Sequence, residues 1–432
     1  MRGKLRPLII VGALLLLNQS GGASEEEFET PTTVRAADFV AARILEGNNY
    51  KVDELARNDG YLNYYVIRSK YGDFEAAGMS MLQTRIKEVD ALAELDDLSR
   101  TDVFIRAATE AGISQIESIR RFATRPVRTV VGIPFGIARM FRRYAHQAGD
   151  AVEATSDFVS GKEGETAQPG ETSNESPQVV VDLTENYLGV SAAERVWAEK
   201  LGTDPYTTND TLRSAIKAVS WTDRLGRFGM RFAPVPTIPG ADIVGQLDDA
   251  VWGNDPYELQ DLLRVQLEDV TDDEELIQQF LDNLKMTPSR KAQLVTSITK
   301  LEGASGRSGI LLLSLNAETE AEAVFFTGSI GMLAWYHTNR KPLLSIVSDN
   351  AIPYGLTTDD QAVVTFATDH VYWTEMTAQV TQNYRATMAE HSVTGRDLWL
   401  LGSASERFIR EISSRDFHVQ QNAAGLLASV PN

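Results

Sequence analysis

Residues 318–337 read ETEAEAVFFTGSIGMLAWYH, a long run that is mostly apolar. Apolar side chains would lie on most sides of a helix built from this run, and a helix of that kind is buried. We therefore expect residues 318–337 to form a central helix against which the other elements pack.

The chain changes character after this helix. Short β-branched and aromatic runs alternate with stretches of helical spacing, which is the pattern of a small α/β sheet. The expected strands are 343–347, 352–356, 362–367, 397–401 and 417–421, and the expected helices are 370–390 and 405–413.

The chain before the central helix reads as mostly helical. Ser191 and Glu194 form a capping box at the start of a helix that ends near Leu201, and Pro288 after Thr287 marks another helix start. Acidic residues at 272–275 suit the first turn of a helix better than a calcium loop. The remaining expected helices are 34–45, 80–98, 99–111, 114–122, 212–221, 257–270, 272–284, 289–301 and 309–315, and a strand is the alternative for 309–315.

A hairpin is expected near the N-terminus. Residues 61–67 read YLNYYVI, and KYGD at 70–73 is a turn sequence, so residues 62–77 predict two antiparallel strands. The clustered tyrosines could form a platform for a sugar or a peptide. Pairing of aromatic side chains across the two strands is the alternative.

The predicted fold class is α+β and mostly helical, with a β-hairpin in the first part and a small α/β sheet at the end. Residues 161–177 read GKEGETAQPGETSNESP and hold too little apolar surface to offset the entropy of ordering. The predicted boundaries are a signal peptide at 1–23, a mobile acidic leader at 24–33, a helical region with the hairpin at 34–159, a disordered linker at 160–178, a helical region at 179–305 and an α/β region at 306–432.

The first residues predict export. Three basic residues precede LIIVGALLLL at 8–17, and the small residues GGA follow at 21–23. This is the pattern of a secretory signal peptide cleaved near Ala23, with an uncleaved anchor as the alternative. Ten helical residues rise about 15 Å, roughly half of a bilayer core, so we do not expect a permanent membrane span here.

The amino-acid composition excludes several classes of function. The chain has no cysteine, which excludes disulfides, thiolate zinc sites and cysteine nucleophiles. An exported eukaryotic protein of this size would usually carry disulfides, so a bacterial periplasmic or secreted location is expected. A net charge of −19 argues against general nucleic-acid binding. The five histidines form no local metal-binding pair, and we expect neither a metal nor a cofactor.

Two motifs carry a resemblance. LGTDPYTTN at 201–209, within the run 189–210, and LWLLGSAS at 398–405 are similar to sequences in a group of uncharacterised exported bacterial proteins. The resemblance covers most of the chain after the signal peptide and implies a location in the bacterial envelope. It implies no activity and no functional residues.

Three residues near the C-terminal strands are candidates for catalysis. Asp369 and His370 could act as an acid and a base, and Ser403 lies between an expected strand and an expected helix. Open α/β sheets place ligands at the carboxyl ends of their strands. The alternative is structural, with Asp369 capping the expected helix at 370–390 and Ser403 forming a capping box with Glu406.

Residues 127–148 are the second candidate site. From residue 100 to 149 the chain holds nine arginines, no lysine and three acids. This stretch is therefore basic, whereas the whole chain is acidic. A helix from residue 135 onward would carry Phe141 on an apolar stripe, with Arg139, Arg142 and Arg143 mostly off it. A cationic amphipathic helix of this type binds anionic lipid or the groove of a partner. Packing of the stripe on the protein's own core is the alternative.

These patterns favour an exported envelope protein that acts by binding a protein partner or a membrane surface. The alternative is a periplasmic, hydrolase-like enzyme with its site at the ends of the C-terminal strands.

Overall fold

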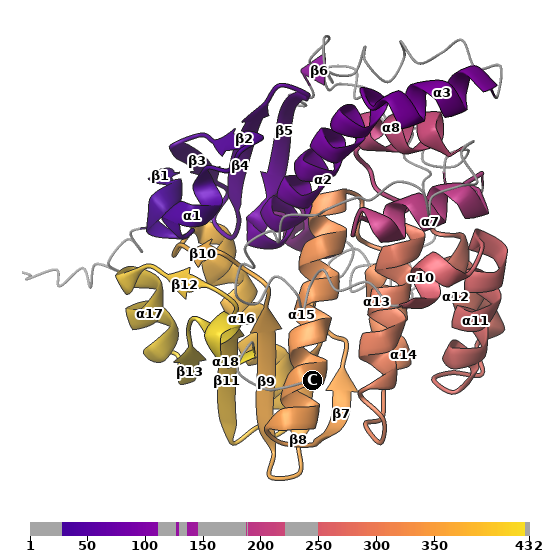
Figure 1. Ribbon diagram of the computed structural model, residues 1–432. Helices are drawn as coiled ribbons and strands as arrows, with labels where there is room; N and C mark the ends of the chain where they lie inside the picture. Colours follow the sequence, from indigo (N-terminus) through magenta and orange to yellow (C-terminus); the bar gives the residue numbers. More distant parts are fainter. Residues whose placement is uncertain are drawn as a thin grey trace, which may run out of the picture.

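The protein is mostly helical and belongs to the α+β class, as predicted (Figure 1). A computed structural model describes residues 28–110, 127–128, 136–145, 187, 189–220 and 249–427. The predicted signal peptide at 1–23, the linker at 160–178 and the helix at 114–122 lie outside the described residues. Two sheets lie on one side of the molecule in Figure 1, and helices form the other side.

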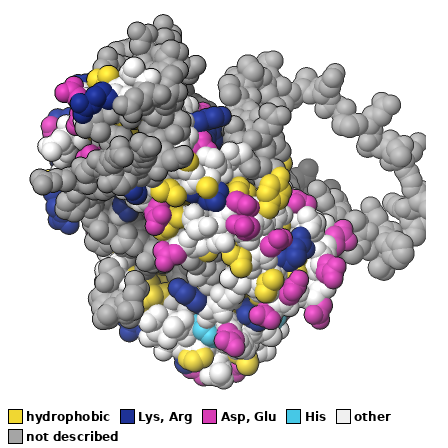
Figure 2. Space-filling view, turned by 45° about the vertical axis from the view of Figure 1, so that its right-hand side comes forward, with side chains coloured by type: hydrophobic (Ala, Val, Ile, Leu, Met, Phe, Trp, Pro, Cys, Tyr) yellow, Lys and Arg dark blue, Asp and Glu magenta, His cyan; other side chains and the backbone are white. Residues whose placement is uncertain are grey.

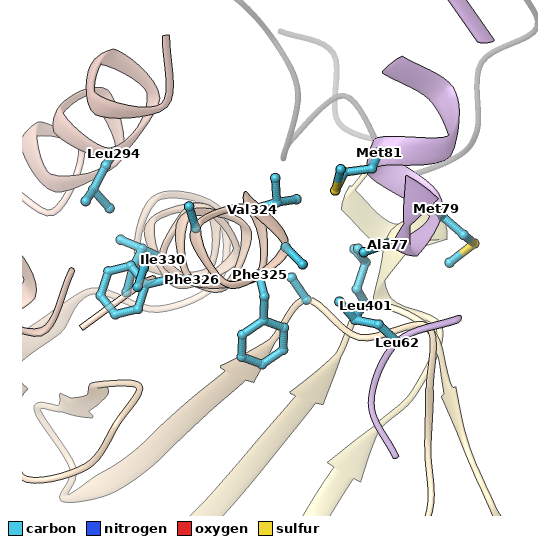
Figure 3. Packing of buried hydrophobic residues seen from close by; sticks show 14 of the residues in the cluster. Leu62, Ala77, Met79, Met81, Leu294, Val324, Phe325, Phe326, Ile330 and Leu401 are labelled. Atoms are coloured by element: carbon cyan, nitrogen blue, oxygen red, sulfur yellow. The ribbon is translucent and has the colours of Figure 1, made fainter. Parts of the chain in front are cut away.

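The predicted central helix is confirmed as α15, Glu320–Asn339. Every residue from Ala321 to Ala334 is buried, as expected for a helix that is apolar all round. One side of α15 packs on the C-terminal sheet and another on α13, Pro288–Thr299. Figure 3 shows its side chains pointing toward Leu294 of α13 in one direction and toward Leu62, Ala77 and Leu401 in the other.

The C-terminal sheet has the strand order β13-β11-β9-β8-β7. Strands β9, β11 and β13 run parallel, and β8 and β7 continue the sheet in antiparallel fashion. Their bounds are β7 Leu343–Val347, β8 Tyr354–Thr357, β9 Gln361–Phe366, β11 Gly395–Leu400 and β13 Phe417–Gln420. The strand segments predicted from the sequence are therefore confirmed to within a few residues.

Helices connect the parallel strands. The helix predicted at 370–390 begins only at Glu375, as α16, Glu375–Glu390, because Thr374 provides its N-cap. The residues before it form a short parallel ladder, in which β10, His370–Val371, pairs with β12, Ser403–Ala404. The remaining helices of this part are α17, Glu406–Ser413, and α18, Ala423–Leu427.

The N-terminal sheet contains the predicted hairpin. Strands β4 and β5 are antiparallel, with Tyr64 opposite Ala77 and Ser69 opposite Gly72. The sheet has the order β1-β3-β4-β5-β6, and β2 pairs with β4 beside β3. Its strands are β1 Thr33–Arg35, β2 Tyr50–Val52, β3 Leu55–Asn58, β4 Asn63–Ser69, β5 Gly72–Ala77 and β6 Val127–Arg128.

The helix predicted at 34–45 is wrong. Residues 33–35 form β1, a 3-10 turn follows at Ala36–Asp38, and only the short helix α1, Ala42–Leu45, remains. Val40 and Ile44 are buried, so the apolar spacing does mark a buried face. Antiparallel pairing of β1 with β3 overrides the helical pattern at the start of the segment.

The helical predictions between the two sheets are confirmed within the described residues. The Ser191–Glu194 capping box is present, Thr287 caps α13, and Asp273 caps α12, whose first turn holds Glu274 and Glu275. The helices are α2 Gly78–Ser99, α3 Asp102–Glu110, α7 Ala192–Lys200, α8 Asp210–Val219, α10 Asp249–Gly253, α11 Pro256–Glu268, α12 Glu274–Asp282 and α14 Ser308–Ser314, with a further helical stretch at 136–145. In the part of the chain that the structure describes, none of the helices is long and apolar enough to cross a bilayer.

The LGTDPYTTN motif at 201–209 folds as a polar loop against α2. The buried Glu88 carboxylate accepts hydrogen bonds from Thr207 and Asn209 of this loop and pairs with Arg85 at 2.9 Å. Arg85 also pairs with Glu320 at the start of α15, again at 2.9 Å. Because each buried charge meets an opposite charge or a hydrogen-bond donor, this motif has a structural role at the junction of α2, α8 and α15.

Candidate functional site

The candidate site lies at the carboxyl ends of the parallel strands β9 and β11. The chain after β9 forms residues 367–374, and the chain after β11 forms residues 401–405. These two segments run side by side through the β10–β12 ladder, in which His370 is the register partner of Ser403. This is the edge at which open α/β sheets place ligands.

His370 and Ser403 are in hydrogen-bond contact. The Nδ1 atom of His370 lies 2.8 Å from the Ser403 hydroxyl oxygen, and both side chains are half-buried. Two half-buried aromatic rings flank the imidazole, with centroid distances of 5.3 Å to Phe39 and 4.8 Å to Tyr372. The structure thus brings together two of the three predicted catalytic candidates.

The surroundings of His370 favour the neutral imidazole. Burial lowers its pKa below the usual value, and the nearby Glu29 carboxylate offsets only part of this effect. When the Ser403 hydroxyl donates to Nδ1, the ring hydrogen is on Nε2. No described residue hydrogen-bonds to Nε2, so this N–H is available to a ligand.

Asp369 faces away from the imidazole. Its carboxylate accepts hydrogen bonds from the backbone N–H groups of Asn63, at 2.9 Å, and Met79, at 3.0 Å. Asp369 was predicted to cap the helix that follows it, and this is wrong, because it instead caps the N-terminus of α2, which is distant in sequence. Burial raises the pKa of this carboxyl to about 7, although the two backbone hydrogen bonds oppose the change.

The capping box predicted for Ser403 and Glu406 is also wrong. Ser405 is the N-cap of α17, since its hydroxyl accepts from the Phe408 N–H at 3.0 Å. Ser405 in turn donates to Glu29, which also accepts from the Trp373 N–H at 2.6 Å. Glu29 was missed because the sequence places it in an acidic leader, and nothing local signals that it folds back onto the C-terminal strands.

The backbone around Ser403 offers no free donors. The N–H of Ser403 donates to the Asp369 carbonyl at 2.9 Å, and that of Ala404 donates to the Gln421 side chain, also at 2.9 Å. The N–H of Ser405 donates to the Val371 carbonyl at 2.8 Å. A serine nucleophile needs free N–H groups nearby to stabilise an oxyanion and an acid to orient its base. Among the described residues, His370 and Ser403 are in contact, but the N–H groups of residues 403–405 are already bonded and the Asp369 carboxylate is bonded elsewhere.

The residues predicted to bind a membrane or partner lie in the helical stretch 136–145. The ring of Phe141 is buried against Tyr61, Phe325 and Phe366, at centroid distances of 5.2, 6.1 and 5.8 Å. The apolar stripe therefore packs on the protein's own core, which is the second of the two alternatives.

The arginines of this helix face acidic residues of the body. Arg143 pairs with the buried Glu322 at 2.6 Å and with Glu318 at 3.3 Å. Arg139 lies 3.8 Å from Glu318, and Arg142 is exposed. The helix is thus held in place by burial of its stripe and by ion pairs with the N-terminal end of α15.

The tyrosines that could have formed a platform are also buried. Tyr61, Tyr64 and Tyr65 belong to the core, so their rings do not form an exposed surface. Among the described residues no group of three or more histidine, aspartate and glutamate side chains is placed to hold a metal ion. Comparisons with protein-family models, with curated proteins and with solved structures found no match.

Proposed function

We propose that the protein is exported to the bacterial envelope and acts there by binding, with its ligand site at the edge formed by Phe39, His370, Tyr372 and Ser403. Export is supported by the sequence of residues 1–23. Binding is supported by one observation above the others. Asp369, the acid needed for catalysis, is bonded to Asn63 and Met79, whereas the imidazole of His370 lies close to two aromatic rings and its Nε2 atom forms no hydrogen bond with a described residue.

The chemistry of this edge selects a class of ligand. Aromatic rings favour contact with an apolar face, and the Nε2 N–H favours a neutral hydrogen-bond acceptor beside that face. Sugar rings and peptide groups both have this character. The bacterial cell wall is built from sugar and peptide, so its soluble fragments are suitable probes.

Replacing His370 or Phe39 by alanine is expected to weaken binding of soluble cell-wall fragments by about tenfold or more, because each change removes a hydrogen bond or a stacking surface. Isothermal titration calorimetry on the full chain measures the effect. His391→Ala is the matched control, since His391 lies 3.4 Å from Asp349 at a different place on the surface. Absence of binding by the unchanged protein, or equal affinity in all three variants, would contradict the proposal.

A hydrolase is the second candidate because of the 2.8 Å contact between His370 and Ser403. A nucleophile and its base lie at this distance in serine hydrolases. The decisive reagent is a fluorophosphonate, which forms a covalent bond with an activated serine.

We expect a fluorophosphonate to leave Ser403 unmodified, because the backbone N–H groups of residues 403–405 are already bonded. Mass spectrometry of the treated protein locates any adduct. Stoichiometric labelling of Ser403 that disappears in His370→Ala would establish the hydrolase and overturn the non-enzymatic proposal. Equal labelling of other serines would indicate only general reactivity, and Ser405 serves as the internal reference.

A further inference from the structure

The outward face of α11 exposes large apolar side chains. Tyr257 is 60% exposed and Val265 is 62% exposed, and they lie two helical turns apart. Leu262, beside them, is 43% exposed. The opposite face of α11 packs on the body of the protein, because Leu259, Leu263 and Leu267 are buried. The outward side of α11 therefore carries three exposed apolar residues among polar ones, whereas the regular apolar stripe on its inner side is covered within the described residues.

The surroundings of the outer stripe are acidic. Residues 255–282, which include α11 and α12, contain ten aspartate or glutamate residues and one basic residue, Arg264. Figure 2 brings this side of the molecule forward and shows acidic side chains gathered there with hydrophobic ones between them. Such a surface attracts cations and repels anions.

Helix capping explains only part of this charge. Asp255 and Asp273 are N-caps, and Glu258 completes a capping box. Asp261 and Glu268 have no such role, and neither forms an ion pair with a described residue. Their exposed carboxylates lie on the same face as Tyr257 and Val265, so negative charge that pairs with no described residue lies among these apolar side chains.

We propose that the outward face of α11 is a docking surface for a positively charged amphipathic segment of a protein partner. The partner's apolar residues would cover Tyr257, Leu262 and Val265, and its lysines or arginines would pair with Asp261 and Glu268. The negative charge of this face distinguishes between three possible binding partners: a second copy of the protein, an anionic membrane and a basic protein segment. A second copy of this face would bring two acidic surfaces together, and an anionic membrane would be repelled, whereas a basic segment is attracted.

The recognition mode is that of an amphipathic helix laid along an apolar stripe. A partner helix of this kind places its apolar side chains at spacings of three and four residues, so that they form one face that can cover Tyr257, Leu262 and Val265. Exposed ion pairs contribute little affinity but increase the association rate and make binding sensitive to salt. Both signatures are measurable with a model peptide.

The probe is a fluorescent helical peptide with leucines on one face and lysines on the other. A scrambled peptide of the same composition, with leucine and lysine no longer segregated, is its control. The full chain should bind the amphipathic peptide at least about tenfold more tightly in fluorescence anisotropy. Raising the salt concentration from about 50 mM to about 300 mM should weaken binding several-fold, because screening shortens the range of charge interactions.

Substitutions on α11 test whether the peptide binds at its outward face. The double variant Tyr257→Ser and Val265→Ser should weaken binding about tenfold or more. The control pair is Leu312→Ser and Leu344→Ser, whose leucines are 56% and 57% exposed on α14 and β7, and it should bind as the unchanged protein does. The pair Asp261→Asn and Glu268→Gln should reduce the salt dependence.

Equal binding of the two peptides, or an equal loss in both serine pairs, would overturn the docking proposal. Circular dichroism establishes that each variant is folded. Calorimetry with cell-wall fragments is a separate measurement at the His370 edge, and the α11 variants should leave it unchanged. Failure of one proposal is therefore distinguishable from failure of the other.

Discussion

Replacing Asp369 by alanine is expected to lower the free energy of unfolding by about 3 to 5 kcal/mol at pH 5. The side chain is 2% exposed, and its two oxygens accept from the N–H groups of Asn63 and Met79. Alanine would leave both donors buried without an acceptor, at a cost of about 1 to 3 kcal/mol each. The donors belong to β4 and α2, so the change also loosens the contact between the N-terminal strands and the C-terminal sheet.

The size of this effect should depend on pH. Burial raises the pKa of Asp369 to about 7 from the ordinary aspartate value of 3.8, so the folded protein binds this proton more tightly than the unfolded chain does. The resulting stabilisation is complete below about pH 4 and is lost as the pH rises through about 7. A shift of this size corresponds to roughly 4 kcal/mol.

Chemical denaturation from pH 4 to pH 8 measures the effect. Asp369→Asn does not titrate at this position, so the stability difference between the unchanged protein and this variant should change across the window in favour of the variant. Asp349→Ala is the control, because Asp349 is exposed, and its effect should stay within about 0.5 kcal/mol. A constant difference between the unchanged protein and Asp369→Asn would show that Asp369 is already ionised in this range.

The elements that the sequence predicted well carry local signals. Apolar periodicity and caps such as Ser191 and Thr287 act within a few residues, so α7, α13 and the central helix α15 are readable without the fold. The start of the chain was misread because β1 is held by pairing with β3, a non-local interaction. Spacing alone does not distinguish a buried helical face from a short strand followed by a turn.

The candidate site was predictable only in its general place. A strand followed by small residues indicated that residues near 370 and 403 lie at the carboxyl edge of a sheet. The contact between His370 and Ser403 depends on the register of β10 and β12, and two residues on each strand are too few to specify a register from sequence. The roles of Asp369 and Glu29 depend on partners 290 or more positions away, so no local pattern could reveal them.

Replacing Gly136 by alanine is expected to destabilise the protein by about 2 to 4 kcal/mol, although alanine is the better helix former by about 1 kcal/mol. A methyl group at Gly136 would clash with both the Asp59 Oδ2 atom and the Tyr64 hydroxyl oxygen. That Asp59 oxygen accepts from the Ile137 N–H and from Tyr64, each at 2.9 Å. Moving the Asp59 carboxylate would break its hydrogen bond with the Ile137 N–H, which anchors the helix, and moving the Tyr64 hydroxyl would break its hydrogen bond with Asp59.

Gly253→Ala, in contrast to Gly136→Ala, is not expected to destabilise the protein. The two substitutions therefore form a matched pair. Gly253 ends helix α10, and a methyl group there would meet no atom within 4 Å. Gly253→Ala should therefore be neutral or slightly stabilising, by up to about 1 kcal/mol. Equal effects of the two substitutions in chemical denaturation would show that close packing at Gly136 does not hold the helix.

Because the chain has no cysteine, a single introduced thiol can report whether the helical stretch 136–145 leaves its packed position. Met140 is 2% exposed, so the single thiol of Met140→Cys should react slowly with a maleimide while residues 136–145 stay packed. Adding Gly136→Ala should accelerate this reaction, because it removes the anchor at Asp59. Leu333→Cys, buried in α15, should keep its slow rate in both backgrounds. If both thiols became reactive together, the substitution would be unfolding the whole protein instead of releasing the helix.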